Sequence, residues 1–489
     1  MNGFRLLSAT IEDPRDGTPM HVEFASDQDL WRGDQPWVSV VIGRNGIGKS
    51  RLLAGIVELF DELDTGRSRR GAFATRPTSL EYQIGGDRFS WHADDSRKTG
   101  SATINGNDGE LADGRLPRRV IAVATTPFDK FKLTGPNASQ ANRVYRYLGL
   151  RDPRGRASAA GAVFRALDSL IEASGSTPDR RSRVADVFEF LGYLPRLEVR
   201  YRWSFRAMRQ THSLAELKAS VDAREGLRPT ALHRMVQDEP ELLERVFKTA
   251  QETRARTGSN RDLSLVVDFR EPGIANAEFF RDLQLLRRAE MVSIEHVELT
   301  QRSTGHRFDL QAASSGELAL VTTFLGLASV MEDDSLVVID EPEVSLHPEW
   351  QAQYIELLTK TFAKYRGCHF VIATHSPLIL SDISPTRSNV VSLESQRRTA
   401  EDSEPYAGQS SDFLLLAAFK VPGKNNLYLK QQMVEALRLA ADGDVTGERY
   451  QTIVSSLADV APSLDEGSPV KELIENLVSA ASEITLTND

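Results

Sequence analysis

The segment that most constrains the fold is Gly-Arg-Asn-Gly-Ile-Gly-Lys-Ser at residues 43–50. An apolar run, WVSVVI at 37–42, precedes it, and KSRLLAGIVELFDELD follows with apolar residues at helical spacing. A strand, a glycine-rich turn and a helix in this order form a phosphate-binding loop, whose backbone N–H groups surround phosphate oxygens. The predicted nucleotide-binding residues are Gly43, Arg44, Asn45, Gly46, Ile47, Gly48, Lys49 and Ser50. Lys49 is expected to reach the β- and γ-phosphates, and Ser50 to bind Mg²⁺.

A second motif places two carboxylates after an apolar run. In SLVVIDEP at 335–342 a predicted strand ends at Asp340 and Glu341. Ligands of an open α/β sheet bind at the carboxyl ends of its strands. Asp340 therefore suits the Mg²⁺ side of the site, and Glu341 suits the general base that activates the attacking water. An acidic pair after a strand is often only the start of a helix, so this motif gains its weight from the phosphate-binding loop.

The order of these motifs resembles the ABC-type ATPase superfamily, in the branch of the SMC, double-strand-break-repair and RecF-like heads. Three more segments support the resemblance. Ala-Ser-Ser-Gly-Glu-Leu at 313–318 resembles the signature motif, Glu-Val-Ser-Leu-His-Pro at 343–348 the D-loop, and Ala-Thr-His-Ser-Pro at 373–377 the switch-histidine motif. The resemblance implies that His375 contacts the γ-phosphate, and that Ser315, Gly316 and Glu317 bind nucleotide held by the opposite protomer.

The resemblance also implies an assembly, because in this family a signature helix caps the nucleotide of a second head. The helix that starts near Ser315 and Gly316 would offer N–H groups and a favourable dipole to an anion. ATP and Mg²⁺ are therefore the expected ligands. A homodimer, or a higher even oligomer built on the same contact, is the expected assembly.

One family feature lacks a clear match. The Q-loop glutamine, which helps to hold Mg²⁺ and water, has no counterpart in VATTPFDKF at 123–131. Thr126 and Asp129 are the two candidates to replace it.

The composition of the 489-residue chain is that of a globular protein, with 40% hydrophobic and 26% charged residues. No apolar run reaches the length of a membrane span, and no secretory signal is evident. Cys368 is the one cysteine, which excludes an internal disulfide framework and a cysteine-rich zinc site. These features favour the cytoplasm and no membrane partner.

The predicted fold class is α/β: an ABC-type head, with a mixed β lobe and a parallel P-loop sheet flanked by helices, plus a mainly helical insertion and a helical C-terminal tail. The expected parts are residues 1–135 with the phosphate-binding loop and β lobe, 136–290 as the insertion, 291–395 with the signature, acidic pair, D-loop and His375, and 396–489 as the tail. The tail is a candidate partner-binding region.

The insertion is rich in arginine. Residues 140–260 hold 22 Arg and Lys against 15 Asp and Glu, a net charge of +7, whereas the whole chain carries −10. Such a segment can meet nucleic acid or an acidic protein, and a solvated helical surface explains it about equally well.

Three uses of the ATPase follow from the resemblance. The segments DEPEVSLHPEWQ and FVIATHSPLIL are similar to those of ATPases from bacterial anti-phage modules, including Septu-type and retron-associated ATPases. That favours a sensor or regulatory ATPase controlling a separate nuclease effector, for which an HNH nuclease is a candidate. The alternatives are a RecF- or SMC-like repair head that binds duplex DNA, and an ATP-gated scaffold with slow turnover. A fused Toprim nuclease is not expected, because Asp442 and Asp444 lie in a predicted loop between helices.

Overall fold

We describe a computed structural model of the chain. The residues described are 3–13, 17–25, 35–66, 76–93, 101–108, 115–133, 143–151, 159–174, 177–205, 212–222, 231–258, 260–271, 274–395, 397–422, 426–464 and 467–487. The chain forms two compact units: the first is Met1–Lys132, Asn137–Tyr145 and Asp333–Asp489, and the second is Leu133–Pro136 and Arg146–Glu332. The expected boundary at 135/136, and residue 396, fall outside the described residues.

The first unit is built on a seven-stranded sheet in the order β17-β16-β3-β15-β14-β8-β9. Its strands are β3 (Trp37–Ile42), β8 (Val120–Ala124), β9 (Tyr145–Gly149), β14 (Leu336–Asp340), β15 (His369–Ala373), β16 (Ser388–Ser392) and β17 (Ala400–Asp402). The strands from β16 to β8 are mutually parallel. All residues of β3, β8, β14 and β15 are buried, as expected for strands covered by helices on both faces.

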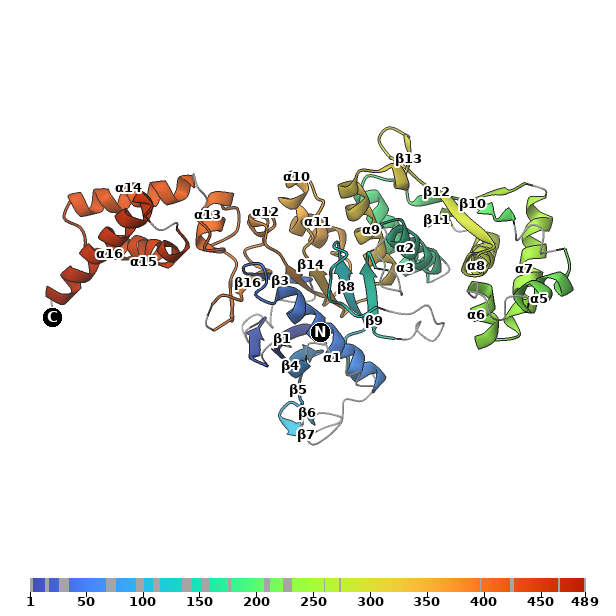
Figure 1. The fold of residues 1–489 in the computed structure, drawn as a ribbon, viewed down its shortest axis with the longest axis horizontal. Coiled ribbons are helices and arrows are strands. Elements are labelled where there is room, and N and C mark those ends of the chain that lie inside the picture. The colour runs from blue at the N-terminus through green and yellow to red at the C-terminus, as the bar shows by residue number, and fades with distance from the viewer. Residues whose placement is uncertain are drawn as a thin grey trace. The chain divides into compact units, whose positions relative to one another are not determined.

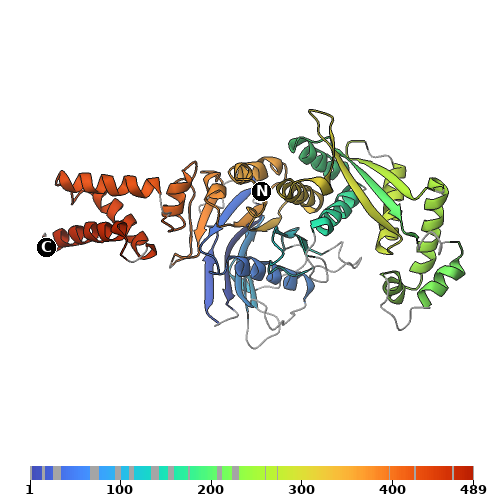
Figure 2. The ribbon, with the colours of Figure 1, turned by 45° about the horizontal axis from the view of Figure 1, so that its top comes forward.

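Helix α1 (Lys49–Thr65) lies on one face of this sheet, and α10 (Pro348–Gln351), α11 (Tyr354–Thr361) and α12 (Pro377–Ser381) lie on the other (Figures 1 and 2). The crossover between the parallel strands β14 and β15 is divided into the two helices α10 and α11. This parallel sheet with helices on both faces is the α/β fold that the motifs predict.

A second sheet packs on the outer side of α1. It is antiparallel, in the order β2-β1-β4-β5-β6-β7. Its strands are β1 (Arg5–Glu12), β2 (Pro19–Glu23), β4 (Arg76–Ile84), β5 (Asp87–His92), β6 (Ser101–Ile104) and β7 (Asn107–Asp108). Phe4, Phe60, Tyr82 and Phe89 stack into one aromatic core between this sheet and α1, with ring centroids 5.1–6.0 Å apart. This core fixes the helix that follows the phosphate-binding loop.

His369 joins the two sheets from inside the core. Its Nδ1 accepts a hydrogen bond from the Leu6 N–H at 3.0 Å, so its Nε2 carries the proton that faces Ser39 Oγ at 2.9 Å. Burial, and to a lesser degree the Arg5 guanidinium, hold the pKa of His369 well below its usual range. This histidine is thus a neutral structural group.

The tail is helical, as predicted. Its helices are α13 (Ser411–Ala417), α14 (Leu427–Ala441), α15 (Glu448–Val460) and α16 (Pro469–Thr487), with the short 3-10 helix η4 (Ala461–Ser463). The last three α-helices enclose a small core of their own that includes Leu429, Tyr450, Leu457 and Ile474. Asp442 and Asp444 lie between α14 and α15, as expected.

The second unit combines helices with a four-stranded antiparallel sheet in the order β11-β10-β12-β13. Its strands are β10 (Arg196–Trp203), β11 (Asp262–Asp268), β12 (Val292–Thr300) and β13 (Arg307–Asp309). Its helices are α2 (Ala159–Ser174), α3 (Pro178–Phe190), α5 (Leu214–Asp222), α6 (Ala231–Asp238), α7 (Leu242–Thr257), α8 (Ile274–Arg288), α9 (Ser315–Val330) and the 3-10 helix η3 (Leu310–Ala312). Strands β12 and β13 form an antiparallel pair that leads into α9, and the segment predicted as a mainly helical insertion also contributes strands β10 and β11.

Three arginines of this sheet, Arg200, Arg202 and Arg307, form ion pairs with carboxylates on neighbouring strands. The pairs are Arg200–Glu298 at 2.9 Å, Arg202–Asp262 at 2.8 Å, Arg202–Glu295 at 3.0 Å and Arg307–Glu198 at 3.0 Å. Arg200 and Arg202 alternate with buried apolar residues of β10, so they lie on the outer face of the sheet, and Arg307 contacts Glu198 and Glu298 on that face. Among the described residues, that face carries interleaved positive and negative side chains and is not a uniformly cationic surface.

Candidate nucleotide-binding and catalytic site

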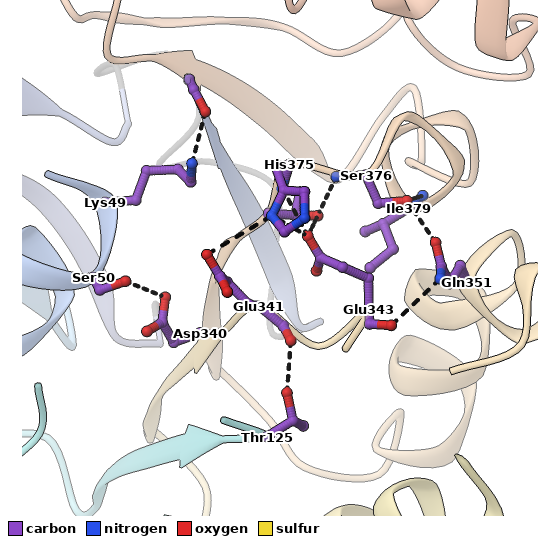
Figure 3. Close-up of polar contacts among 12 residues, drawn as sticks. Lys49, Ser50, Thr125, Asp340, Glu341, Glu343, Gln351, His375, Ser376 and Ile379 are labelled. Carbon is purple, nitrogen blue, oxygen red and sulfur yellow. Dashed lines mark hydrogen bonds and ion pairs between the residues drawn. The ribbon is translucent and has the colours of Figure 1, made fainter. Parts of the chain in front are cut away.

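Three adjacent strands of the parallel sheet deliver the predicted site residues to one edge. β15 lies between β3 and β14. The phosphate-binding loop follows β3, Asp340 ends β14, and His375 comes two residues after β15. Because these strands are parallel, their carboxyl ends meet at the same edge of the sheet. The structure therefore brings residues from distant parts of the sequence into the single group shown in Figure 3.

The glycines of the loop adopt backbone conformations that other residues rarely take. Gly46 and Gly48 have φ of 82° and 121°. A Cβ atom on Gly48 would lie 2.7 Å from Met20 Cε, so the end of that flexible side chain would have to move, and the φ of Gly48 itself disfavours a side chain. Gly48 caps α1 without a side-chain hydrogen bond. The N-terminal N–H groups of a 17-residue helix thus open toward the loop, which suits a phosphate.

Lys49 is buried, with 5% of its surface exposed. Its Nζ donates to the Gly43 carbonyl at 2.6 Å, across the loop. Burial lowers the pKa of this ammonium group, and the carboxylates of Glu341, Glu343 and Asp340 oppose that shift. A cation held among carboxylates beside a ring of N–H groups is suited to bind a polyanion.

The side chains of Ser50 and Asp340, the two predicted Mg²⁺ ligands, are in contact. The Ser50 hydroxyl donates to Asp340 Oδ1 at 3.0 Å, and Asp340 is 3% exposed. Burial raises the pKa of Asp340 to about 7, against the hydrogen bond from Ser50 and with the help of neighbouring carboxylates. A hydroxyl and a carboxylate are the oxygen ligands that Mg²⁺ prefers, and an ion there would supply the charge that favours ionised Asp340.

Glu341 follows in a strained conformation. Its φ is 49°, in the left-handed region that residues with a side chain rarely adopt. Two hydrogen bonds secure its backbone: its N–H donates to the Ala373 carbonyl at 2.9 Å, and its carbonyl accepts from Thr125 Oγ1 at 2.6 Å. The carboxylate remains 28% exposed. A partly exposed carboxylate on a fixed backbone is suited to accept a proton from water.

His375 lies beside two carboxylates. Its Nδ1 is 3.0 Å from Glu343 Oε1 and 3.7 Å from Glu341 Oε1, and 43% of its side chain is exposed. Glu343 was predicted only as the first residue of the D-loop segment. The sequence signal that could have found it is a third acidic residue directly after Asp-Glu-Pro, in a segment otherwise without charge as far as its histidine.

The segment at 123–131, where a Q-loop is expected, begins at the end of β8. Asp129 is 5% exposed, and its Oδ1 accepts from the Phe131 N–H at 3.1 Å. Its charge is among those that raise the pKa of Asp340. In the same segment, the hydroxyl of Thr125, and not that of Thr126, donates to the Glu341 carbonyl. Asp129 or Thr126 as the substitute for the glutamine stays a prediction.

The signature segment belongs to the second unit, where it starts α9. Ser314 is the N-cap: its hydroxyl accepts from the Glu317 N–H at 3.3 Å, and Glu317 Oε2 accepts from the Ser314 N–H at 3.1 Å. This capping box occupies the Glu317 side chain within its own chain. Ser315 is exposed and Gly316 buried. The exposed start of the helix is the part free to meet a phosphate.

Arg44 has two contacts that sequence reasoning missed. Its backbone N–H donates to Glu394 Oε1 at 2.6 Å, and its Nε lies 3.5 Å from the other oxygen of that carboxylate. Its Nη2 donates to Ser463 Oγ at 2.9 Å, in η4 of the tail. No pattern in the sequence connects residues so far apart. The phosphate-binding loop therefore touches the tail through Arg44.

Parts of the chain are similar to known proteins. Residues 192–381 match the family described as "AAA domain, putative AbiEii toxin, Type IV TA system". Over 134 residues the chain is 25% identical to "Retron Vc95 probable ATPase" of Vibrio cholerae serotype O1 biovar El Tor, covering 25% of this chain and 26% of that protein. Over 115 residues it is 33% identical to "Retron Ec83 probable ATPase" of Escherichia coli, covering 23% and 20%.

The chain thus spans about a quarter or less of the length of these curated relatives. Among solved structures, the SMC head domain from Thermotoga maritima is similar with a TM-score of 0.35 and 12% identity, covering 81% of this chain and 98% of that one. Over these segments the chain is similar to the retron ATPases, and its motif order resembles that of ABC-type ATPase heads. Within the described residues, no helix is both long and apolar enough to cross a membrane.

Proposed function

We infer that the chain binds and hydrolyses ATP at a site that two copies complete together. The observation that carries this proposal is the group formed at one sheet edge by Lys49, the Ser50–Asp340 pair, Glu341 and His375. Every one of these groups comes from a motif with a role in phosphoryl transfer, and the structure holds them on neighbouring strands.

Each residue has a separate task in the proposed reaction. The loop N–H groups and Lys49 bind the phosphates, and Ser50 and Asp340 hold Mg²⁺, which would neutralise charge on the β- and γ-phosphates. Glu341 accepts a proton from the water that attacks the γ-phosphorus, as the bond to the β-phosphate oxygen breaks. His375 contacts the γ-phosphate. The start of α9 from a second copy, at Ser315 and Gly316, covers the same phosphate with N–H groups.

Two variants test this proposal. Lys49→Ala should remove ATP binding, because it deletes the buried cation that faces the phosphates. Glu341→Gln should retain ATP but not hydrolyse it, and should accumulate as a dimer in light scattering with ATP and Mg²⁺. A Glu341→Gln chain that stays monomeric under those conditions would contradict the shared site.

The biological use that we propose is regulation of a separate nuclease effector in an anti-phage module. Its support is the similarity to retron ATPases and the similarity of the acidic-pair and histidine segments to defence ATPases. The repair alternative has less support, because Arg200, Arg202 and Arg307 on the outer face of the β10–β13 sheet are paired with carboxylates. Purification of Glu341→Gln from the native host, with Lys49→Ala as the matched control, tests the partner. A nuclease retained only by the first variant supports the proposal, and salt-sensitive duplex DNA binding without any nuclease contradicts it.

A further inference from the structure

Glu343 is a buried carboxylate that the proposed reaction does not use. It lies in the turn after β14, and only 6% of its surface is exposed. A buried carboxylate is costly unless hydrogen bonds satisfy it, so its partners explain its position. Among the described residues, the hydrogen-bond and ion-pair partners of the carboxylate belong to one short segment, Thr374–His375, which follows the neighbouring strand.

One oxygen of Glu343 receives all of these contacts. Oε1 accepts from Thr374 Oγ1 at 2.8 Å and from the His375 backbone N–H at 2.8 Å, and it lies 3.0 Å from His375 Nδ1 (Figure 3). The backbone and the ring of His375 are therefore held by the same atom. Because Nδ1–H donates to this carboxylate, Nε2 is the ring nitrogen left to face a ligand, and it needs a proton of its own to donate to a phosphate oxygen.

A second residue strengthens the same connection. Gln351 donates from Nε2 to the carbonyls of Glu343 at 3.3 Å and Leu346 at 3.0 Å, and its Oε1 accepts from Ser376 Oγ at 2.8 Å. The turn that carries Glu343 and the segment that carries His375 are thus bound together at two points.

We propose that Glu343 is the positioning residue for His375: it sets the direction of the imidazole ring and the nitrogen that carries the proton. This inference rests on the proposed function for the role of His375 in ATP hydrolysis. Glu343 itself does not touch the substrate. Because it lies in the segment that resembles the D-loop, it also links the histidine to the face expected to meet a second copy.

The first test observes the ring directly in the full-length chain. Histidine ring nitrogens are labelled with ¹⁵N, and His375→Gln assigns the His375 signals among those of the nine histidines. The wild type should show a single state with the proton on Nδ1. Glu343→Ala should show a mixture of tautomers, whereas Glu343→Gln, whose amide oxygen can accept the same bonds, should resemble the wild type. Unchanged His375 signals in Glu343→Ala would overturn the proposal.

The second test is a double-mutant cycle on ATP turnover. In the wild-type background Glu343→Ala should lower kcat about tenfold or more while the Kd for ATP changes less than about threefold. In a His375→Ala background the same substitution should have almost no further effect. An equal loss of turnover in both backgrounds would show a general structural role and reject the proposal. If the wild type hydrolyses no ATP, the proposed function fails, but the ring measurement still decides how His375 is held.

Discussion

Asp340 shows how the site depends on charge at the scale of one residue. Its carboxyl group has a pKa of about 7 in the folded chain and an ordinary value of 3.8. The folded chain therefore binds this proton more tightly than the unfolded chain does. The protonated carboxyl group therefore stabilises the folded chain fully below pH 4, and this stabilisation is lost as the pH rises through 7. By pH 8 the folded chain has lost at most roughly 4 kcal/mol of stability from this group.

This sign leads to a prediction for Asp340→Asn in Mg²⁺-free buffer. The amide can still accept from Ser50 but carries no charge, so the variant should melt above the wild type at pH 8 and close to it at pH 5. Thermal unfolding followed by circular dichroism at both pH values measures the difference. A difference in Tm that is the same at both pH values would show that the Asp340 carboxyl is not the titrating group.

The start of α9 poses a question at the scale of the element. Ser314 and Glu317 close the helix through a capping box, and Ser315 is exposed beside them. Two adjacent serines thus have different tasks, one in the helix and one proposed for the nucleotide of another copy. Ser314, as the N-cap, also lies at the helix terminus, where the helix dipole favours an anion.

Alanine at each serine separates these tasks. Ser314→Ala should cost about 1 kcal/mol of local stability and speed hydrogen exchange of the Glu317 amide, because the N-cap is lost. Ser315→Ala should leave that exchange unchanged and instead weaken ATP-dependent dimerisation. Hydrogen exchange by mass spectrometry and light scattering measure the two effects. Equal effects of both variants on both measurements would refute this division.

At the scale of the whole molecule, the sequence predicted the parts that short motifs encode. The strand and helix on either side of the loop at 43–50, and the strand that ends at Asp340, follow from local patterns, and the structure confirms these elements. Glu343 and the Glu394–Arg44–Ser463 contacts did not follow from the sequence. They depend on side-chain directions and on pairings across more than thirty positions, which periodicity does not report.

The pairing of charges in the second unit has the same origin. Counting arginines indicates a basic segment, but Arg200 and Arg202 face carboxylates from strands distant in the sequence. Composition gives only the number of charged residues in a segment. The register of the sheet determines which of them pair across neighbouring strands. The tail offers a further case, since its contact with Arg44 arises from a single serine at the end of a helix.

The shared ATP site is tested most directly by mixing two inactive variants. Lys49→Ala leaves α9 intact, and Ser315→Arg alters an exposed residue at the start of α9 while leaving the phosphate-binding loop intact. In a symmetric dimer each mixed pair regains one complete site, so an equimolar mixture should recover roughly a quarter of wild-type ATPase activity. Each variant alone should stay inactive. A mixture no more active than its parts, despite exchange of subunits shown by light scattering or labelled chains, would contradict the account.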